Sequence, residues 1–156
     1  MDDREAKITQ YKCYLDSIDN FVDRNFHVNR FFIMLNIGLL IGLIVFNKFA
    51  FADYITAGLL LSSLGTVTSL LYLGNVDAYS FLIKLKLKDV IEPIEKELPL
   101  QIHESENHAI EAWRKNSKTF VFTDLQKVLA YLFLLIFAIN FLHEIVPFVI
   151  YTFNLF

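Results

Sequence analysis

The chain has 156 residues, of which 55% are hydrophobic, 15% aromatic and 20% charged. This is more apolar surface than a soluble core of that size needs, so charged and apolar residues must be segregated along the chain. The formal net charge of −3 argues against nucleic acid as a partner, because phosphate binding needs clustered Lys and Arg. The single cysteine, Cys13, cannot form an internal disulfide, which fits a reducing compartment for its segment.

Residues 1–30 are predicted to form a cytoplasmic amphipathic helix. Its apolar residues recur at steps of three or four: Ile8, Tyr11, Leu15, Ile18, Val22 and Phe26. This face could pack against the rest of the protein, or it could lie flat on lipid. No Gly or Pro occurs before Gly38, so we expect the helix to continue into the membrane. The mixed charges do not match a cleaved signal peptide, and the first span is therefore expected to stay as an anchor.

Residues 31–74 are predicted to form a transmembrane helical hairpin. Phe31 to Phe46 is the first span, because with a few flanking residues at ~1.5 Å per residue it approaches the ~30 Å of a bilayer core. Ile55 to Tyr72 is the second span. The connection from Asn47 to Asp53 is so short that the two spans must be antiparallel neighbours.

Several residues of these spans favour close packing of helices. Asn36 lies in the first span, where its amide needs a partner on another helix or in a neighbouring copy. Gly38 and Gly42 have the GxxxG spacing that lets a second helix approach closely. Small residues also form a stripe along the second span: Gly58, Ser62, Thr66 and Ser69.

Residues 75–125 are predicted to form a small, α-rich cytoplasmic domain between spans two and three. Its first part keeps a helical spacing of apolar residues: Val76, Tyr79, Ile83, Leu87, Ile91 and Ile94. The letters KLKLK alternate as a strand does, but the flanking residues favour an amphipathic helix that is kinked near Pro93 and ends at Leu98-Pro99. We expect a loop and a short helix in Leu100 to Ser117, and an extended piece in Thr119 to Phe122.

Residues 126–156 are predicted to contain the third transmembrane helix, Val128 to Leu142, and an apolar tail. Thr123 followed by Gln126 has the spacing of a capping box, which would start the helix immediately before this span.

The end of the third span is predicted from the free-energy cost of a charge in the bilayer and from the length of the remaining chain. His143 and Glu144 are expected at the far interface, because a charged carboxylate is costly at bilayer depth. Ile145 to Phe156 would cover only ~18 Å as a helix, too little to cross back. We expect this tail to be broken at Pro147 and to lie at the outer interface or against other spans.

Basic residues predict the orientation of the three spans. Of the 14 Lys and Arg residues, 13 precede the first span or lie between spans two and three, and Lys48 alone lies on the opposite side. The positive-inside rule therefore places the N-terminal helix and residues 75–125 in the cytoplasm, and the C-terminus outside. The predicted fold is an all-α membrane protein with three transmembrane helices, an amphipathic N-terminal helix and a small cytoplasmic α-rich insert.

Several residues, in order along the chain, resemble the RipA-like family of bacterial membrane proteins. The residues that carry the resemblance are Tyr11, Tyr14, Asp19, Arg24, Asn29, Phe31, Phe32 and Asn36, then Glu97-Leu98-Pro99 and Thr123-Asp124-Leu125-Gln126-Lys127. The sharpest part is DxxxxRxxxxNxFFxxxN, from Asp19 to Asn36. The resemblance implies a homo-oligomer of the bacterial cytoplasmic (inner) membrane, described as octameric, in which the C-terminus that the positive-inside rule places outside would be periplasmic. It also implies a role in adaptation and growth inside host cells, with no established chemical activity.

No pattern in the sequence predicts catalysis, a cofactor or a metal site. The residues His103, Glu104, Glu106, His108 and Glu111 lie close together, but their spacing matches no known zinc site, so a solvated loop is the better interpretation. The residues predicted to carry helix packing or oligomer contacts are Asp19, Arg24, Asn29, Phe31, Phe32, Asn36, Gly38, Gly42, Gly58, Ser62 and Thr66.

Two classes of function remain open. The preferred one is a homo-oligomeric scaffold or sensor, with the lipid bilayer, further copies of itself and a cytoplasmic protein as candidate partners. The alternative is a membrane-permeabilising or channel-forming effector, for example in phage defence. A membrane enzyme would rest on the His and Glu residues of 103–111 alone, so we expect no enzymatic activity.

Overall fold

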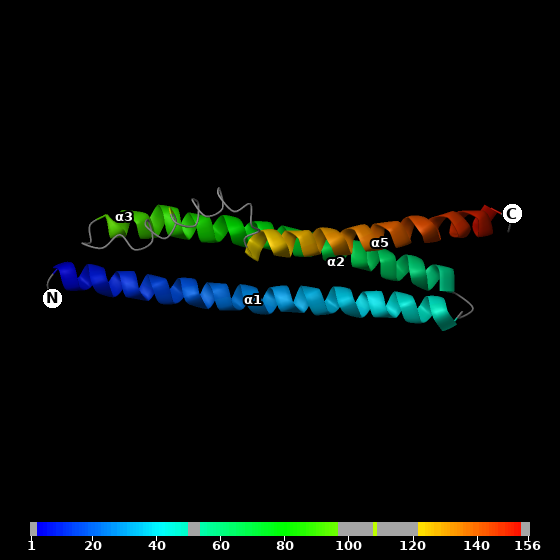
Figure 1. Ribbon diagram of the computed structural model, residues 1–156, viewed down its shortest axis with the longest axis horizontal. Coiled ribbons are helices and arrows are strands. Elements are labelled where there is room, and N and C mark those ends of the chain that lie inside the picture. The colour runs from blue at the N-terminus through cyan, green and yellow to red at the C-terminus, as the bar shows by residue number, and fades with distance from the viewer. Residues whose placement is uncertain (1–2, 50–53, 97–107, 109–121, 154–156) are drawn as a thin grey trace. The chain divides into compact units, whose positions relative to one another are not determined.

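The computed structural model describes residues 3–49, 54–96, 108 and 122–153. The elements in these ranges are α1 (Asp3–Phe49), α2 (Tyr54–Lys86), the π-helical turn η1 (Leu87–Ile91), α3 (Glu92–Glu95) and α5 (Phe122–Phe153) (Figure 1). No strand occurs in the described ranges, which confirms the all-α prediction. The predicted loop and short helix of residues 100–117 lie outside these ranges apart from His108, and Phe122 is helical rather than extended.

In the described ranges, three helices are long and apolar enough to cross a membrane. The segments are Glu5–Phe46, Thr56–Glu95 and Asp124–Val146. The first one confirms that the N-terminal helix continues into an apolar span without a break. The helix α1 extends to Phe49, three residues into the predicted connection, so only residues 50–53 separate α1 from α2.

The chain divides into two compact units, and α1 and α2 contribute to both. The first unit is Met1–His27 with Asp77–Leu125, and the second is Val28–Val76 with Gln126–Phe156. Each unit has its own packed residues.

The second unit buries two small hydrophobic clusters between α1, α2 and α5. In one, Leu43 packs with Phe133 and Phe137, and in the other Tyr72 and Val76 pack with Ala130. Most other large apolar side chains of this unit are exposed, among them Met34, Ile41, Ile44, Leu64, Leu135 and Ile139. A soluble monomer rarely exposes so much contiguous apolar surface, so this surface faces lipid or other chains.

The first unit packs only part of the apolar face predicted for the N-terminal helix. Ile18 is buried, but Val22 is 44% exposed and Phe26 is 54% exposed. The packed face is rotated slightly about the helix axis from the predicted one. It includes Phe21, whose ring stacks on Tyr79 with centroids 5.1 Å apart. The predicted face was therefore wider than the one this unit covers, because spacing alone does not show which edge of an apolar stripe meets a neighbour.

A π-helical turn, η1, lies just before Pro93, the residue near which the sequence predicts a kink. Proline has no N–H, and its ring clashes with the carbonyl oxygen four residues earlier. The backbone accommodates this before the proline, where the Glu92 N–H donates to Leu87 O, five residues back. The helical form of this segment confirms the preference for a helix over a strand.

The expected break at Pro147 is wrong, because α5 continues to Phe153. A proline removes one backbone hydrogen bond, and helices in an apolar environment tolerate it where the freed carbonyl finds another donor or a local adjustment. Since the residues on both sides of Pro147 are strongly apolar, the helix has no polar segment at which to stop.

Candidate functional site

A polar cluster around Asn36 lies inside the second unit. Asn36 is fully buried, and its Oδ1 accepts hydrogen bonds from Thr68 Oγ1 at 3.1 Å and Ser69 Oγ at 3.0 Å. Its Nδ2 donates to the Phe32 carbonyl at 2.8 Å, one turn earlier in α1. Asn36 thus finds its partners on α2 of the same chain, which was one of the two possibilities that the sequence left open.

The two hydroxyl groups of this cluster each have a second acceptor. Thr68 Oγ1 and Ser69 Oγ also lie 3.0 and 2.8 Å from the Gly65 carbonyl oxygen. A hydroxyl has one hydrogen, so each group either bonds Asn36, bonds Gly65 or shares its hydrogen between them. The cluster is consequently asymmetric: the hydroxyls have an alternative partner if Asn36 is lost, but Asn36 Oδ1 has no other donor in this cluster if they are lost.

Further polar side chains continue along the buried face of α2. Asn75 Nδ2 donates to Asn29 Oδ1 at 3.3 Å, and the ring of Phe32 stacks on Tyr72 with centroids 5.5 Å apart. Among the described residues, three buried polar atoms have no hydrogen-bond partner: Asn29 Nδ2, Ser62 Oγ and Tyr72 Oη. Such atoms are uncommon in native interiors, and here they line the same interior face as the Asn36 cluster.

The glycines of the second unit differ in what they face. A Cβ added at Gly38 would meet no atom within 4 Å, whereas one at Gly42 would contact Leu61 of α2 at 3.7 Å. A Cβ at Gly58 would lie 3.3 Å from the Glu144 carboxyl carbon, and one at Gly65 would overlap the Phe137 ring. The GxxxG pair is therefore split: Gly42 faces α2 of its own chain, and Gly38 faces open space.

Thr66 and Gly58, both predicted packing residues of α2, have different neighbours. Thr66 Oγ1 donates to the backbone oxygen of Ser62 at 2.8 Å, within its own helix. Glu144 is buried against Gly58, while the neighbouring His143 is 80% exposed and its Nδ1 lies 3.7 Å from Glu144 Oε1. The residue type at Gly58 thus leaves space for the carboxyl group of Glu144.

Other predicted residues have environments of their own. Asp19 and Arg24 are exposed in the first unit, where the Arg24 guanidinium lies 5.4 Å from the centroid of the Phe21 ring. Phe31, in the second unit, is 60% exposed. The sequence pattern from Asp19 to Asn36 therefore combines residues with different environments.

Two contacts in the structure have no signal in the sequence. Gly65, missed in the predicted small-residue stripe, has the tightest approach of any described glycine. In the first unit, the Tyr11 hydroxyl donates to Glu95 Oε1 at 2.7 Å across 84 residues of sequence. Burial, with this hydrogen bond and the charge of Glu95, raises the pKa of Tyr11 to about 12.

The described residues contain no group of three His, Cys, Asp or Glu that could hold a metal ion. The His and Glu residues considered at 103–111 lie outside the described ranges, except for the exposed His108. The side chain of Thr123, half of the predicted capping box, also lies outside them.

Comparison with known proteins gives one family match. The model of the family described as "Octameric membrane protein family (8xMP)" matches residues 8–146, which is most of the chain. No curated protein and no solved structure matches the chain significantly.

Proposed function

Because the chain belongs to the Octameric membrane protein family, we propose that it works as a homo-oligomeric scaffold or sensor in the bacterial cytoplasmic membrane. The family description motivates the homo-oligomer and the count of eight subunits. The proposal assigns no chemical reaction. We also propose that the chain, like the RipA-like proteins that it resembles, has a role in adaptation and intracellular growth.

The observation that carries the proposal is the open face at Gly38. The GxxxG spacing provides a smooth surface for a second helix, yet among the described residues a neighbour covers Gly42 and none covers Gly38. Ile37 and Ile41, on either side of Gly38 in sequence, are 45% and 56% exposed. A second copy of the chain can approach closely here without any rearrangement of the protomer.

The proposed orientation follows from charge. The N-terminal helix and the segment between spans two and three carry 13 of the 14 Lys and Arg residues, which favours the cytoplasm for both. A cytoplasmic first unit could then receive a signal or a protein partner, while the second unit holds the assembly in the bilayer.

The test measures the mass of the purified protein in a mild detergent by light scattering. We expect an oligomer whose mass is several times 18.2 kDa, and a smaller species for Gly38→Leu. Gly74→Leu is the matched control, because Gly74 also faces open space but belongs to no GxxxG pair. Wild-type protein that is monomeric at every concentration would refute the proposal, and equal effects of the two variants would remove Gly38 from the interface.

One observation favours the second candidate, a membrane-permeabilising effector. The buried face of α2 carries polar groups at helical spacing, including the unpartnered Ser62 Oγ and Tyr72 Oη. Polar residues within spans often belong to ion or proton pathways. The test is the release of a pH gradient from liposomes that contain the protein: sustained gradients would exclude this function, and rapid loss that Ser62→Ala slows would favour it.

A further inference from the structure

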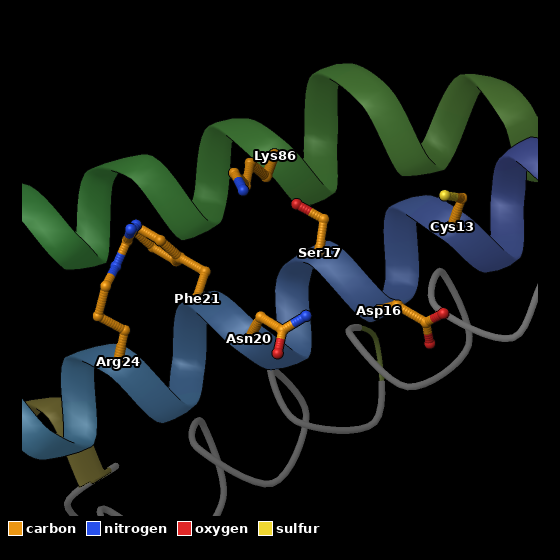
Figure 2. Close-up of a pocket in the computed structure, with 7 residues that line it drawn as sticks. All are labelled: Cys13, Asp16, Ser17, Asn20, Phe21, Arg24 and Lys86. Carbon is orange, nitrogen blue, oxygen red and sulfur yellow. The ribbon is translucent and has the colours of Figure 1, made fainter.

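A polar pocket lies within the first unit, along one face of α1 (Figure 2). The residues that α1 contributes, from Cys13 to Arg24, recur at alternating steps of three and one, so they share one face of the helix. Lys86, the last residue of α2, completes the lining from the other side. The cavity volume is about 410 Å³, which is within the usual range for a small-molecule site.

One end of the pocket holds two cations on a single aromatic ring. The Arg24 guanidinium carbon lies 5.4 Å from the centroid of the Phe21 ring, and Lys86 Nζ lies 4.7 Å from the same centroid. Figure 2 shows both side chains converging on Phe21 from α1 and α2. Cation–π contacts hold the two charges in place, and Phe21 is itself fixed by stacking on Tyr79.

In the part of the chain that the structure describes, no carboxylate neutralises the two cations. Among the described residues, neither Arg24 nor Lys86 forms an ion pair with a carboxylate. Two like charges held on one ring repel each other, and an anion between them would remove that repulsion. Ser17 and Asn20, on the same face of α1, add a hydroxyl and an amide that can donate neutral hydrogen bonds to an anion's oxygens.

We propose that this pocket binds a small phosphate-bearing molecule, with its phosphate group between Arg24 and Lys86. Guanidinium groups bind phosphate through two parallel hydrogen bonds, and a lysine ammonium adds a point charge. The other end of the pocket has Asp16, whose carboxylate repels an anion but accepts hydrogen bonds. A hydroxyl or amino group at that end of the ligand would add a hydrogen bond to Asp16, but the binding of the phosphate group does not require it.

The phosphate could belong to a soluble metabolite or to a lipid headgroup. Arg24 precedes Phe31, the first residue of the first apolar span, by seven residues of α1, or ~10 Å of helix. Asp16 lies eight residues further from the span. The far end of the pocket is thus well beyond the headgroup layer, and a soluble ligand fits this position better. The inference rests on the proposed cytoplasmic placement of this unit, and it gives the sensor a class of ligand.

The test uses Cys13, the only cysteine of the chain, as a reporter at the rim of the pocket. The rate of its alkylation by N-ethylmaleimide is measured in phosphatidylcholine nanodiscs, with and without inorganic pyrophosphate, at ionic strength matched with sodium chloride. A bound probe shields the thiol, and mass action predicts about tenfold slower alkylation at ten times the Kd. The same rate is also measured without pyrophosphate in nanodiscs that contain phosphatidylglycerol.

Protection by pyrophosphate supports a soluble ligand, and protection by phosphatidylglycerol alone supports a headgroup. In either arm, Arg24→Gln and Lys86→Gln should lose the protection, and Lys86→Arg should keep it. Lys84→Gln is the matched control, because it removes one positive charge from the exposed side of α2 and should keep full protection. No protection in either arm, or equal loss in Lys84→Gln and Lys86→Gln, would overturn the proposal. The assay does not depend on subunit number, so its failure is distinct from failure of the oligomer.

Discussion

The hydrogen bonds around Asn36 predict that removing its two donors on α2 lowers the stability of the protein more than replacing Asn36 itself. Thr68→Val with Ser69→Ala removes both donors and leaves the fully buried Asn36 Oδ1 without a partner. A buried unsatisfied acceptor costs about 1–3 kcal/mol. Asn36→Leu, in contrast, frees two hydroxyls that can both turn to the Gly65 carbonyl. With ~0.6 kcal/mol for a typical hydrogen bond between membrane helices, we expect this variant to lose about 1 kcal/mol.

The triple variant, with Leu at 36, Val at 68 and Ala at 69, provides the sharpest comparison. Because it leaves no polar atom of the cluster unpaired, it should be more stable than the Thr68→Val, Ser69→Ala double variant. The free energy of unfolding is measured by titrating the detergent-solubilised protein with sodium dodecyl sulfate, with helicity followed by circular dichroism. Ser63→Ala is the control, since the exposed Ser63 hydroxyl bonds only to its own helix, at Leu60 O, and should change stability by less than about 0.5 kcal/mol.

Two results would refute this reasoning. One is an Asn36→Leu variant that is less stable than the Thr68→Val, Ser69→Ala variant. The other is a triple variant whose loss equals the sum of the separate losses, because additivity would show that the three side chains do not interact.

Three further predictions follow from other contacts. Gly65→Ala should lose about 1–3 kcal/mol because its methyl group overlaps Phe137, whereas Gly74→Ala, in open space, should gain up to about 1 kcal/mol; both are checked by the same titration. Burial first and Glu95 second raise the pKa of Tyr11, so the folded state disfavours the ionised phenol and the stability of the fold falls as the pH rises from 10 to about 12. In an absorbance titration of the tyrosines, Tyr11→Phe should remove one late step, and Glu95→Gln should shift that step only part of the way to 10, because burial is the largest cause. Pro93→Ala should let η1 become α-helical and rotate Glu95 by ~100°, so the late step should shift part of the way to 10, as in Glu95→Gln; an unchanged titration would contradict this.

The sequence was sufficient for the three spans and for the continuity of α1. Both depend on strong local signals: long apolar segments, and the lack of Gly or Pro before Gly38. Asn36 was also identified as a buried polar residue, since an amide within a span must find a partner. Its partners Thr68 and Ser69 could not be assigned, because the register between α1 and α2 depends on side-chain packing rather than on spacing within either helix.

Other features depend on contacts that spacing cannot show. Tyr11 and Glu95 meet across 84 residues, and Gly65 is distinguished from Gly38 only by the presence of Phe137. The predicted break at Pro147 is wrong because proline ends helices mainly in water, where the freed carbonyl group bonds to solvent. In an apolar segment no solvent is present to bond that carbonyl group, so the helix continues. The convergence of Arg24 and Lys86 on Phe21 was likewise invisible, because one cation belongs to α1 and the other to α2.

The positions of the two chain ends relative to the membrane test the three crossings and the cytoplasmic first unit most directly. A fluorescent protein that matures only in the cytoplasm, and alkaline phosphatase that is active only in the periplasm, are each fused after Phe156 and, separately, before Met1. Three crossings with a cytoplasmic first unit predict active phosphatase at the C-terminus and fluorescence at the N-terminus. A fluorescent C-terminal fusion, with inactive phosphatase at the same position, would contradict three crossings, the cytoplasmic pocket and the proposed sensor together.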